Sequence, residues 1–200
     1  TIDTDKKVIT INPNSDFSSE QVVYVAIGTT VEDAADNAIS AANATFTAAD
    51  SAAPTITFSP VNGATAVANG SNITLTFNEA IRLVNDTALS DTNVDALITL
   101  KATNSAGADI AFDATIDTDK KVITINPNSD FSTEQVVYVA IGTTVEDASD
   151  NAISAANATF TAKDSAAPTI TFSPADSATG VANGSNITLT FNEAIRLVND

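Results

Sequence analysis

Apolar and polar residues alternate with a period of two along much of this 200-residue chain. In residues 73–77, for example, Ile73, Leu75 and Phe77 are separated by threonines. This period places alternate side chains on opposite faces of a strand, so it predicts half-buried antiparallel strands. About seven strands are predicted in the central part of the chain, at residues 55–58, 73–77, 97–100, 110–116, 122–125, 135–142 and 158–162.

The connections between these runs are short and rich in turn-forming residues, such as Asn62-Gly63 and Asn126-Pro127. A unit of about 110 residues with roughly seven short strands predicts an all-β fold, an immunoglobulin-like (Ig-like) antiparallel β-sandwich. The chain has no Cys and no Trp, so only the architecture of an antibody domain is predicted. Its fold must be held by a packed core, by strand pairing or by bound ions.

The chain also repeats itself. Residues 1–86 return as residues 115–200, an offset of 115 − 1 = 114 positions, with seven substitutions. Linkers of small residues ending in proline are predicted at 49–54 and 163–168. They divide the chain into the C-terminal part of one repeat (1–50), a complete repeat (51–164) and the N-terminal part of the next (165–200).

Close copying favours a spacer over an enzyme, because a catalytic site does not need to be duplicated so faithfully. We therefore expect this chain to be a slice of a longer tandem array. The absence of Met leads to the related expectation that it is an internal or processed segment.

Three segments carry a family resemblance. Residues 53–60 and 72–81, with the sequences APTITFSP and NITLTFNEAI, resemble the opening of the bacterial Ig-like domains of S-layer proteins and giant surface adhesins. Residues 145–153 resemble the family's closing V-x-D-x-x-G-N signature, although Asp150 stands where glycine is usual. The resemblance implies tandem β-sandwiches used for reach and spacing on an extracellular bacterial surface.

The net charge of the chain restricts the molecules that it is expected to bind. With 25 acidic and 8 basic residues the net charge is −17, which excludes nucleic acid and anionic membrane surfaces and favours cations. No apolar run approaches the roughly 20 residues of a membrane-spanning helix, so membrane insertion is not expected either.

A calcium site is predicted at the junction between repeats. In an Ig-like sandwich the incoming linker, the loop after the second strand and the loop between the last two strands share one pole. These elements bring carboxylate and amide oxygens together, and Ca²⁺ takes six to eight such ligands. The alternative is a solvated acidic rim without metal. The predicted ligands, including the repeat counterparts of Asp50 and Glu79, are Asp50, Asn78, Glu79, Asp147, Asp150, Asn151, Asp164 and Glu193, with Glu146 beside them.

The sequence favours one of three functions. The favoured one is a structural extender, a stalk segment of a large cell-surface adhesin that is stiffened by calcium at its junctions; an S-layer lattice protein uses similar domains and is the alternative parent. The second function, a carbohydrate- or protein-binding module, would need an exposed apolar or aromatic patch. The third, a hydrolytic or accessory domain of a secreted enzyme, is least expected, because there is no His or Cys and the paired acids lack a predicted cleft.

The two partial repeats predict a further contact. Besides neighbouring repeats of the same chain, the late strands of residues 1–50 and the early strands of residues 165–200 are complementary. Head-to-tail completion between adjacent chains would propagate as a filament. The joined pieces would lack counterparts of residues 87–114, since 200 − 114 = 86 residues are duplicated. The alternative is that the flanks are cut from a longer continuous chain.

Overall fold

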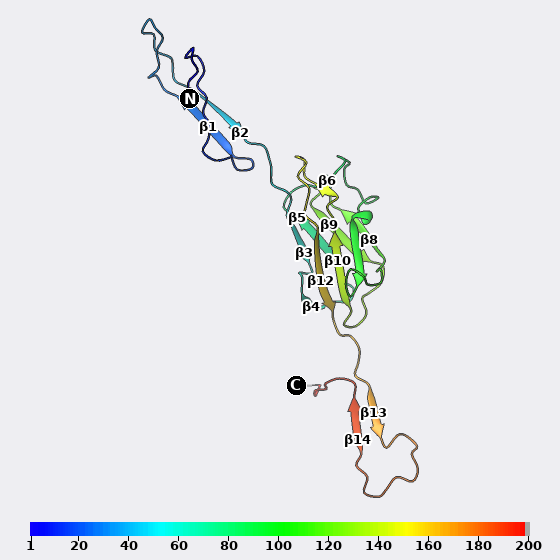
Figure 1. The fold of residues 1–200 in the computed structure, drawn as a ribbon. Coiled ribbons are helices and arrows are strands. Elements are labelled where there is room, and N and C mark those ends of the chain that lie inside the picture. The colour runs from blue at the N-terminus through cyan, green and yellow to red at the C-terminus, as the bar shows by residue number, and fades with distance from the viewer. Residues whose placement is uncertain (199–200) are drawn as a thin grey trace.

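A computed structural model describes residues 1–198 as a central β-sandwich with an arm at either end (Figure 1). The sandwich lies within residues 51–164, and all the buried hydrophobic residues of the described chain lie between Ile73 and Ala162. We call residues 1–50 the N-terminal arm and residues 165–198 the C-terminal arm. The two arms leave the sandwich at opposite ends.

One sheet of the sandwich is antiparallel throughout, with the strand order β3-β5-β9-β8. Its alternating sequence produces the predicted two faces: Ile73 and Leu75 are fully buried, whereas Thr76 is exposed. In this sheet Ile73 lies opposite Ile125, and Leu75 lies opposite Ile123. The strands are β3 (Ile56–Ser59), β5 (Ile73–Phe77), β8 (Phe112–Ile116) and β9 (Val122–Pro127).

The second sheet has the order β4-β12-β10-β7. Its outer pair β4–β12 is parallel, a feature that the sequence did not predict, because the four residues of β4 lack a marked alternation. The chain thus crosses from the first sheet (β3) to the second (β4) before returning, and the order matches that of an immunoglobulin sandwich. The strands are β4 (Ala64–Val67), β7 (Ile98–Ala102), β10 (Val136–Ile141) and β12 (Ala156–Ala162).

The predicted Ig-like β-sandwich is therefore confirmed. The structure adds a two-stranded pairing at one pole, where Glu146 lies opposite Arg82, and a single 3-10 turn that precedes β7. These elements are too short to leave a periodic signal in the sequence. They are β6 (Arg82–Leu83), β11 (Val145–Glu146) and η1 (Asp95–Leu97).

One outer strand of each sheet, β8 in the first and β7 in the second, has its edge occupied by hydrogen bonds. Asp95 and Asp91 each accept one from an amide of the edge strand β8, at Ala114 (2.7 Å) and Ile116 (2.9 Å). On β7, the chain folds back and the Ala102 amide donates to a carbonyl at residue 108 (2.8 Å). Unpaired strand edges promote pairing between molecules, so these contacts keep strands from being added at these two edges.

Each arm contains one antiparallel hairpin, formed by β1 (Val22–Ile27) with β2 (Ala42–Thr47) and by β13 (Ile170–Ser173) with β14 (Thr188–Phe191). Their registers repeat those of β10–β12 and β3–β5 at the 114-residue offset. Unlike those counterparts, the arm strands have no second sheet packed on them. Among the described residues no helix is long and apolar enough to cross a membrane.

At one position of positive φ the complete repeat has an alanine and the C-terminal arm has a glycine. Ala66 in β4 has a φ of 54°, in the left-handed region, and its counterpart is Gly180 with a φ of 70°. This conformation costs an L-residue about 1–2 kcal/mol relative to glycine, while glycine loses about 0.4–1 kcal/mol of stability through the greater entropy of the unfolded chain.

We predict that Ala66→Gly raises the free energy of unfolding of the sandwich by about 0.8 kcal/mol, the difference between the midpoints of these two effects. Urea denaturation of the full chain measures it. Ala64→Gly in the same strand serves as the control, because Ala64 has no positive φ, and should lower stability. A loss of stability in Ala66→Gly equal to that in the control would contradict the argument.

Candidate metal centre at the domain junction

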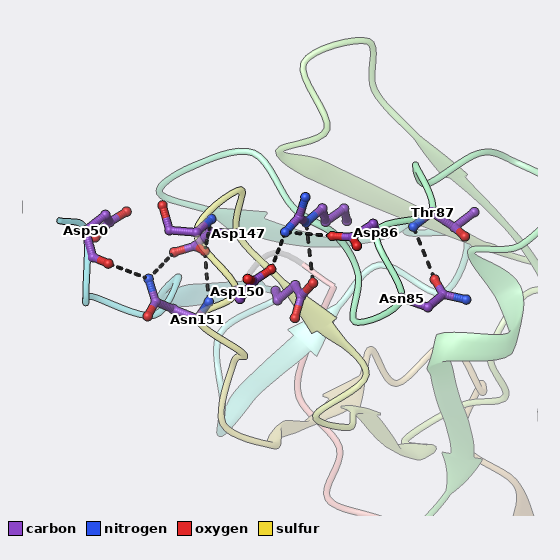
Figure 2. A network of polar contacts seen from close by, with 10 residues as sticks. Asp50, Asn85, Asp86, Thr87, Asp147, Asp150 and Asn151 are labelled. Carbon is purple, nitrogen blue, oxygen red and sulfur yellow. Dashed lines mark hydrogen bonds and ion pairs between the residues drawn. The ribbon is translucent and has the colours of Figure 1, made fainter.

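Three carboxylates meet where the N-terminal arm joins the sandwich. One oxygen each from Asp50, Glu79 and Asp147 lies within 4.8 Å of the other two. Asp50 comes from the linker, Glu79 from the loop after β5, and Asp147 from the loop after β11 (Figure 2 shows Asp50 and Asp147). We call these three residues the junction cluster. Three oxygens at this spacing match the first part of the ligand set of a hard cation such as Ca²⁺.

Asp147 is the most rigidly held of the three. It is 1% exposed, and its Oδ1 accepts hydrogen bonds from the amides of Ser149 (2.7 Å) and Asn151 (2.9 Å). Its Oδ2 accepts one from Nδ2 of Asn151 (2.8 Å). Burial opposes ionisation of Asp147, but these hydrogen bonds and the charge of Arg82 outweigh it and lower the pKa. The carboxylate is therefore fixed in place and charged at neutral pH.

Asp50 joins the linker by hydrogen bonds to the N-terminal arm and to the sandwich. Its Oδ1 accepts hydrogen bonds from Oγ of Ser19 in the arm (2.6 Å) and from the Ala52 amide (3.0 Å). Its carbonyl accepts one from Nδ2 of Asn151 in the sandwich (3.4 Å). The Ser51 amide in turn donates to Oγ of Ser19 (2.9 Å). We call the hydrogen bonds that join Ser19, Asp50, Ser51 and Ala52 the linker clamp.

The same clamp recurs at the second junction, before the C-terminal arm. Asp164 Oδ1 accepts hydrogen bonds from Oγ1 of Thr133 (2.6 Å) and the Ala166 amide (2.9 Å). The Ser165 amide donates to the Thr133 hydroxyl (3.0 Å). The Thr133 bond, together with that from Ala166 and one with Glu193, lowers the pKa of Asp164. The predicted residues Asp164 and Glu193 are thus brought together, as Asp50 and Glu79 are at the first junction.

Burial and the neighbouring carboxylates oppose the ionisation of Glu79 in the junction cluster. Partial burial raises the pKa of Glu79, and the charges of Asp147 and Asp50 raise it further. A hydrogen bond from Nδ2 of Asn78 (3.2 Å) partly offsets these effects. Asn78 Oδ1 accepts a hydrogen bond from the Thr55 amide (2.6 Å), so Asn78 links the loop after β5 to the residue that precedes β3.

A second acidic group surrounds an arginine beside the junction cluster. Arg82 lies 2.8 Å from Asp86, 3.4 Å from Glu146 and 2.5 Å from Asp150, measured between nitrogen and carboxylate oxygen (Figure 2). Asp150, predicted as a ligand with the junction residues, thus lies in this separate group. Its φ of 68° belongs to the turn that sends it toward Arg82. The guanidinium supplies the cation here, and it joins β6 and the turn after it to β11 and the loop after β11.

The structure brings together part of the predicted ligand set. Asp50, Glu79 and Asp147 come together, with Asn151 bound to two of them and Asn78 bound to the third. Sequence reasoning missed Arg82 and Asp86. The signal that could have identified them was Arg82 itself, one of only two arginines among 200 residues and four residues before an acid.

A family model described as "Bacterial Ig-like domain" matches residues 50–162 and 164–199. The chain belongs to the bacterial Ig-like domain family. The two matched segments begin at the two linkers, so the family's domain starts where the linker clamps lie. No curated protein matches the chain.

Solved structures with similar folds include the CopC protein from Methylosinus trichosporium OB3b. The alignment has 16% sequence identity and a TM-score of 0.38, and it covers 57% of this chain and 97% of CopC.

The raised pKa of Glu79 predicts a pH-dependent stability. A carboxyl whose folded pKa lies above its ordinary value of 4.5 favours folding when it is protonated. That contribution is complete below pH 4.5 and is lost as the pH rises through the folded pKa. In a chelator-containing buffer, Glu79→Gln should therefore raise the free energy of unfolding at pH 7 and have less effect at pH 4.

Urea denaturation at the two pH values measures this difference. Asp113→Asn, which removes one exposed negative charge from β8, is the matched control and should change stability equally little at both. Equal effects of Glu79→Gln at pH 4 and pH 7 would contradict the assignment of repulsion to the junction cluster.

Proposed function

We propose that this chain is an extender segment of a bacterial surface protein, in which successive bacterial Ig-like repeats hold a distal region away from the cell. The family is a non-enzymatic domain type found in surface and extracellular proteins of bacteria. The observation that carries the proposal is the recurrence of the linker clamp, with Asp50 and Asp164 in equivalent hydrogen bonds at the two junctions. A spacer needs such repeated, fixed junctions, whereas an isolated binding domain does not.

The surface of the complete repeat supports the same proposal. Among the described residues 51–164, the large exposed apolar side chains are Val61, Val84 and Val136. They belong to three different segments, the loop before β4, the turn after β6 and the start of β10. Binding modules for proteins or sugars present contiguous apolar or aromatic patches, so scattered valines favour a spacing role.

Calcium at the junction is the second part of the proposal. The junction cluster joins an arm residue, Asp50, to two sandwich residues, Glu79 and Asp147. A bound Ca²⁺ would cancel their repulsion and add a bridge between consecutive repeats, with Asn151 and backbone carbonyls available as further oxygen ligands. The junction would then resist bending more strongly than the clamp hydrogen bonds alone.

We expect calcium to raise the melting temperature of the full chain. A ligand at 100 times its dissociation constant stabilises by about 2.7 kcal/mol, which corresponds to about 10 °C for a domain of this size. Calorimetry with calcium and with chelator measures the shift, and Asp50→Asn should reduce it. Asp113→Asn, which removes the same charge far from the junction, should not. An equal melting temperature in calcium and in chelator would contradict the calcium site but not the spacer function.

The spacer function is tested by the distribution of distances between two spin labels, one on each side of the first junction. Because the chain has no Cys, spin labels can be attached at Thr45→Cys in β2 and Thr99→Cys in β7 without competing sites. Both positions are exposed. A narrow distribution is expected, and Ser19→Ala, which removes the clamp hydroxyl, should broaden it. A broad distribution in the chain with Ser19 intact, in calcium and in chelator alike, would overturn the spacer.

A further inference from the structure

Two Asn-Gly pairs flank strand β4 in the complete repeat, Asn62-Gly63 before it and Asn69-Gly70 after it. A third pair lies in the C-terminal arm. Because glycine has no Cβ, its backbone nitrogen can approach the side chain of the preceding asparagine more closely than that of a larger residue can. An Asn-Gly pair is therefore chemically reactive unless the fold holds the two groups apart.

The first pair is held by hydrogen bonds to β12. The Gly63 amide donates to the carbonyl of Thr159 (2.7 Å). Oδ1 of Asn62 accepts hydrogen bonds from the Thr159 amide (2.9 Å) and from the Thr159 hydroxyl (3.3 Å). The backbone nitrogen and the side chain of this pair are thus both fixed on one residue of the neighbouring strand. The Gly63 nitrogen can react only after its hydrogen bond breaks.

The second pair lacks such a restraint on its backbone nitrogen. Within the described residues 1–198 no hydrogen bond uses the Gly70 amide, and Gly70 is exposed. The turn is closed one residue later, where the Ser71 amide donates to the carbonyl of Ala68 (3.0 Å). On the side chain, Nδ2 of Asn69 donates to Oγ of Ser165 in the second linker (3.2 Å).

Glycine at position 70 leaves room for the carboxylate of Asp130. Oδ1 of Asp130 lies 3.0 Å from the position that a Cβ of residue 70 would occupy, so a larger residue would have to displace this carboxylate. The Phe131 amide donates to the carbonyl of Asn69 (2.8 Å) and joins the same two loops. The close packing of the loop after β4 thus favours the reactive Asn-Gly sequence.

We propose that Asn69 is a site of spontaneous deamidation at the second junction. The Gly70 nitrogen loses its proton to a solvent base and attacks Cγ of Asn69. A C–N bond forms, the bond from Cγ to Nδ2 breaks, and ammonia leaves with a proton returned by the solvent. The resulting five-membered succinimide takes up one water, which opens either of its two C–N bonds. The net change is from asparagine and water to ammonia and an aspartyl or isoaspartyl residue at position 69.

The reaction would change the linker contact at the second junction. A carboxylate accepts hydrogen bonds but donates none, so the bond from Nδ2 of Asn69 to Ser165 is lost. The new negative charge also lies in a loop that already packs against Asp130. Because the Ser165 amide belongs to the linker clamp, deamidation should loosen this junction as the protein ages. The chemistry itself does not depend on the spacer function.

Peptide mapping by mass spectrometry tests the site, after the full chain has been kept for several weeks in mildly alkaline buffer. Asn69 should convert about tenfold faster than Asn62, which is the effect on a rate of one hydrogen bond of about 1.4 kcal/mol. Labelling by isoaspartyl methyltransferase identifies the isoaspartyl product. In concentrated urea the hydrogen bonds of both pairs are absent, so the two asparagines should convert at similar rates.

The effect on the junction is measured with spin labels at Thr99→Cys in β7 and Thr171→Cys in β13, which are both exposed positions. Asn69→Asp carries the charge of the product and should broaden the distribution of distances between the labels. Asn69→Gln is the matched control, because it retains a neutral amide donor, and it should leave the distribution as it is in the unaltered chain.

Three outcomes would overturn the proposal. Conversion of Asn62 that equals or exceeds conversion of Asn69 in the folded chain would contradict the site. A tenfold difference that persists in urea would assign the selectivity to local sequence instead of to the hydrogen bonds of Gly63. An unchanged distance distribution in Asn69→Asp would contradict the effect on the junction. A broad distribution in the unaltered chain counts against the spacer function alone, because the deamidation rates are measured independently of it.

Discussion

The apolar face of a β-sheet is stable in water only when a second sheet covers it, and this constraint separates the middle of the chain from its arms. Leu75 and Leu189 occupy the same sequence, yet the first is fully buried and the second is half exposed. Burying such a side chain is worth about 1.5–3 kcal/mol. A domain's net stability is only about 5–15 kcal/mol, so a few uncovered positions decide whether a unit has a core. Hairpin register survives in the arms because it requires only local pairing.

Covering the core also determines the electrostatics of the junction. Once the two sheets close, the loops after β5 and β11 must end at one pole, and the linker enters there. Acidic residues on these segments are then forced together. Arg82 neutralises part of this charge by bridging β6 to β11 and the loop after it, while Glu79 lies among Asp50 and Asp147 and has no ion pair with a basic side chain among residues 1–198. The fold thus concentrates repulsion at the junction between repeats.

Much of this organisation could be predicted from the sequence, because a period of two and a 114-residue repeat are properties of the chain itself. The strands around Leu75, the all-β class and the convergence of Asp50, Glu79 and Asp147 follow from alternation and from known sandwich topology. The position of Asp150 does not, since a left-handed residue in a short loop redirects a side chain without changing any pattern. Nor does the parallel β4–β12 pair, which depends on the chain crossing between sheets.

The substitutions between repeats leave the contacts of the linker clamp in place. Ser19 and Thr133 differ by a methyl group, yet both donate a hydroxyl hydrogen bond of 2.6 Å to the linker aspartate. Ala35 and Ser149 both use only their backbone amide to bind the aspartate of their loop. The differences therefore retain the donors of the clamp and of the acidic loop while side chains beside them change. The divergence between repeats therefore leaves the hydrogen bonds around Asp50 and Asp164 unchanged, because these bonds use backbone amides and hydroxyl groups that both repeats supply.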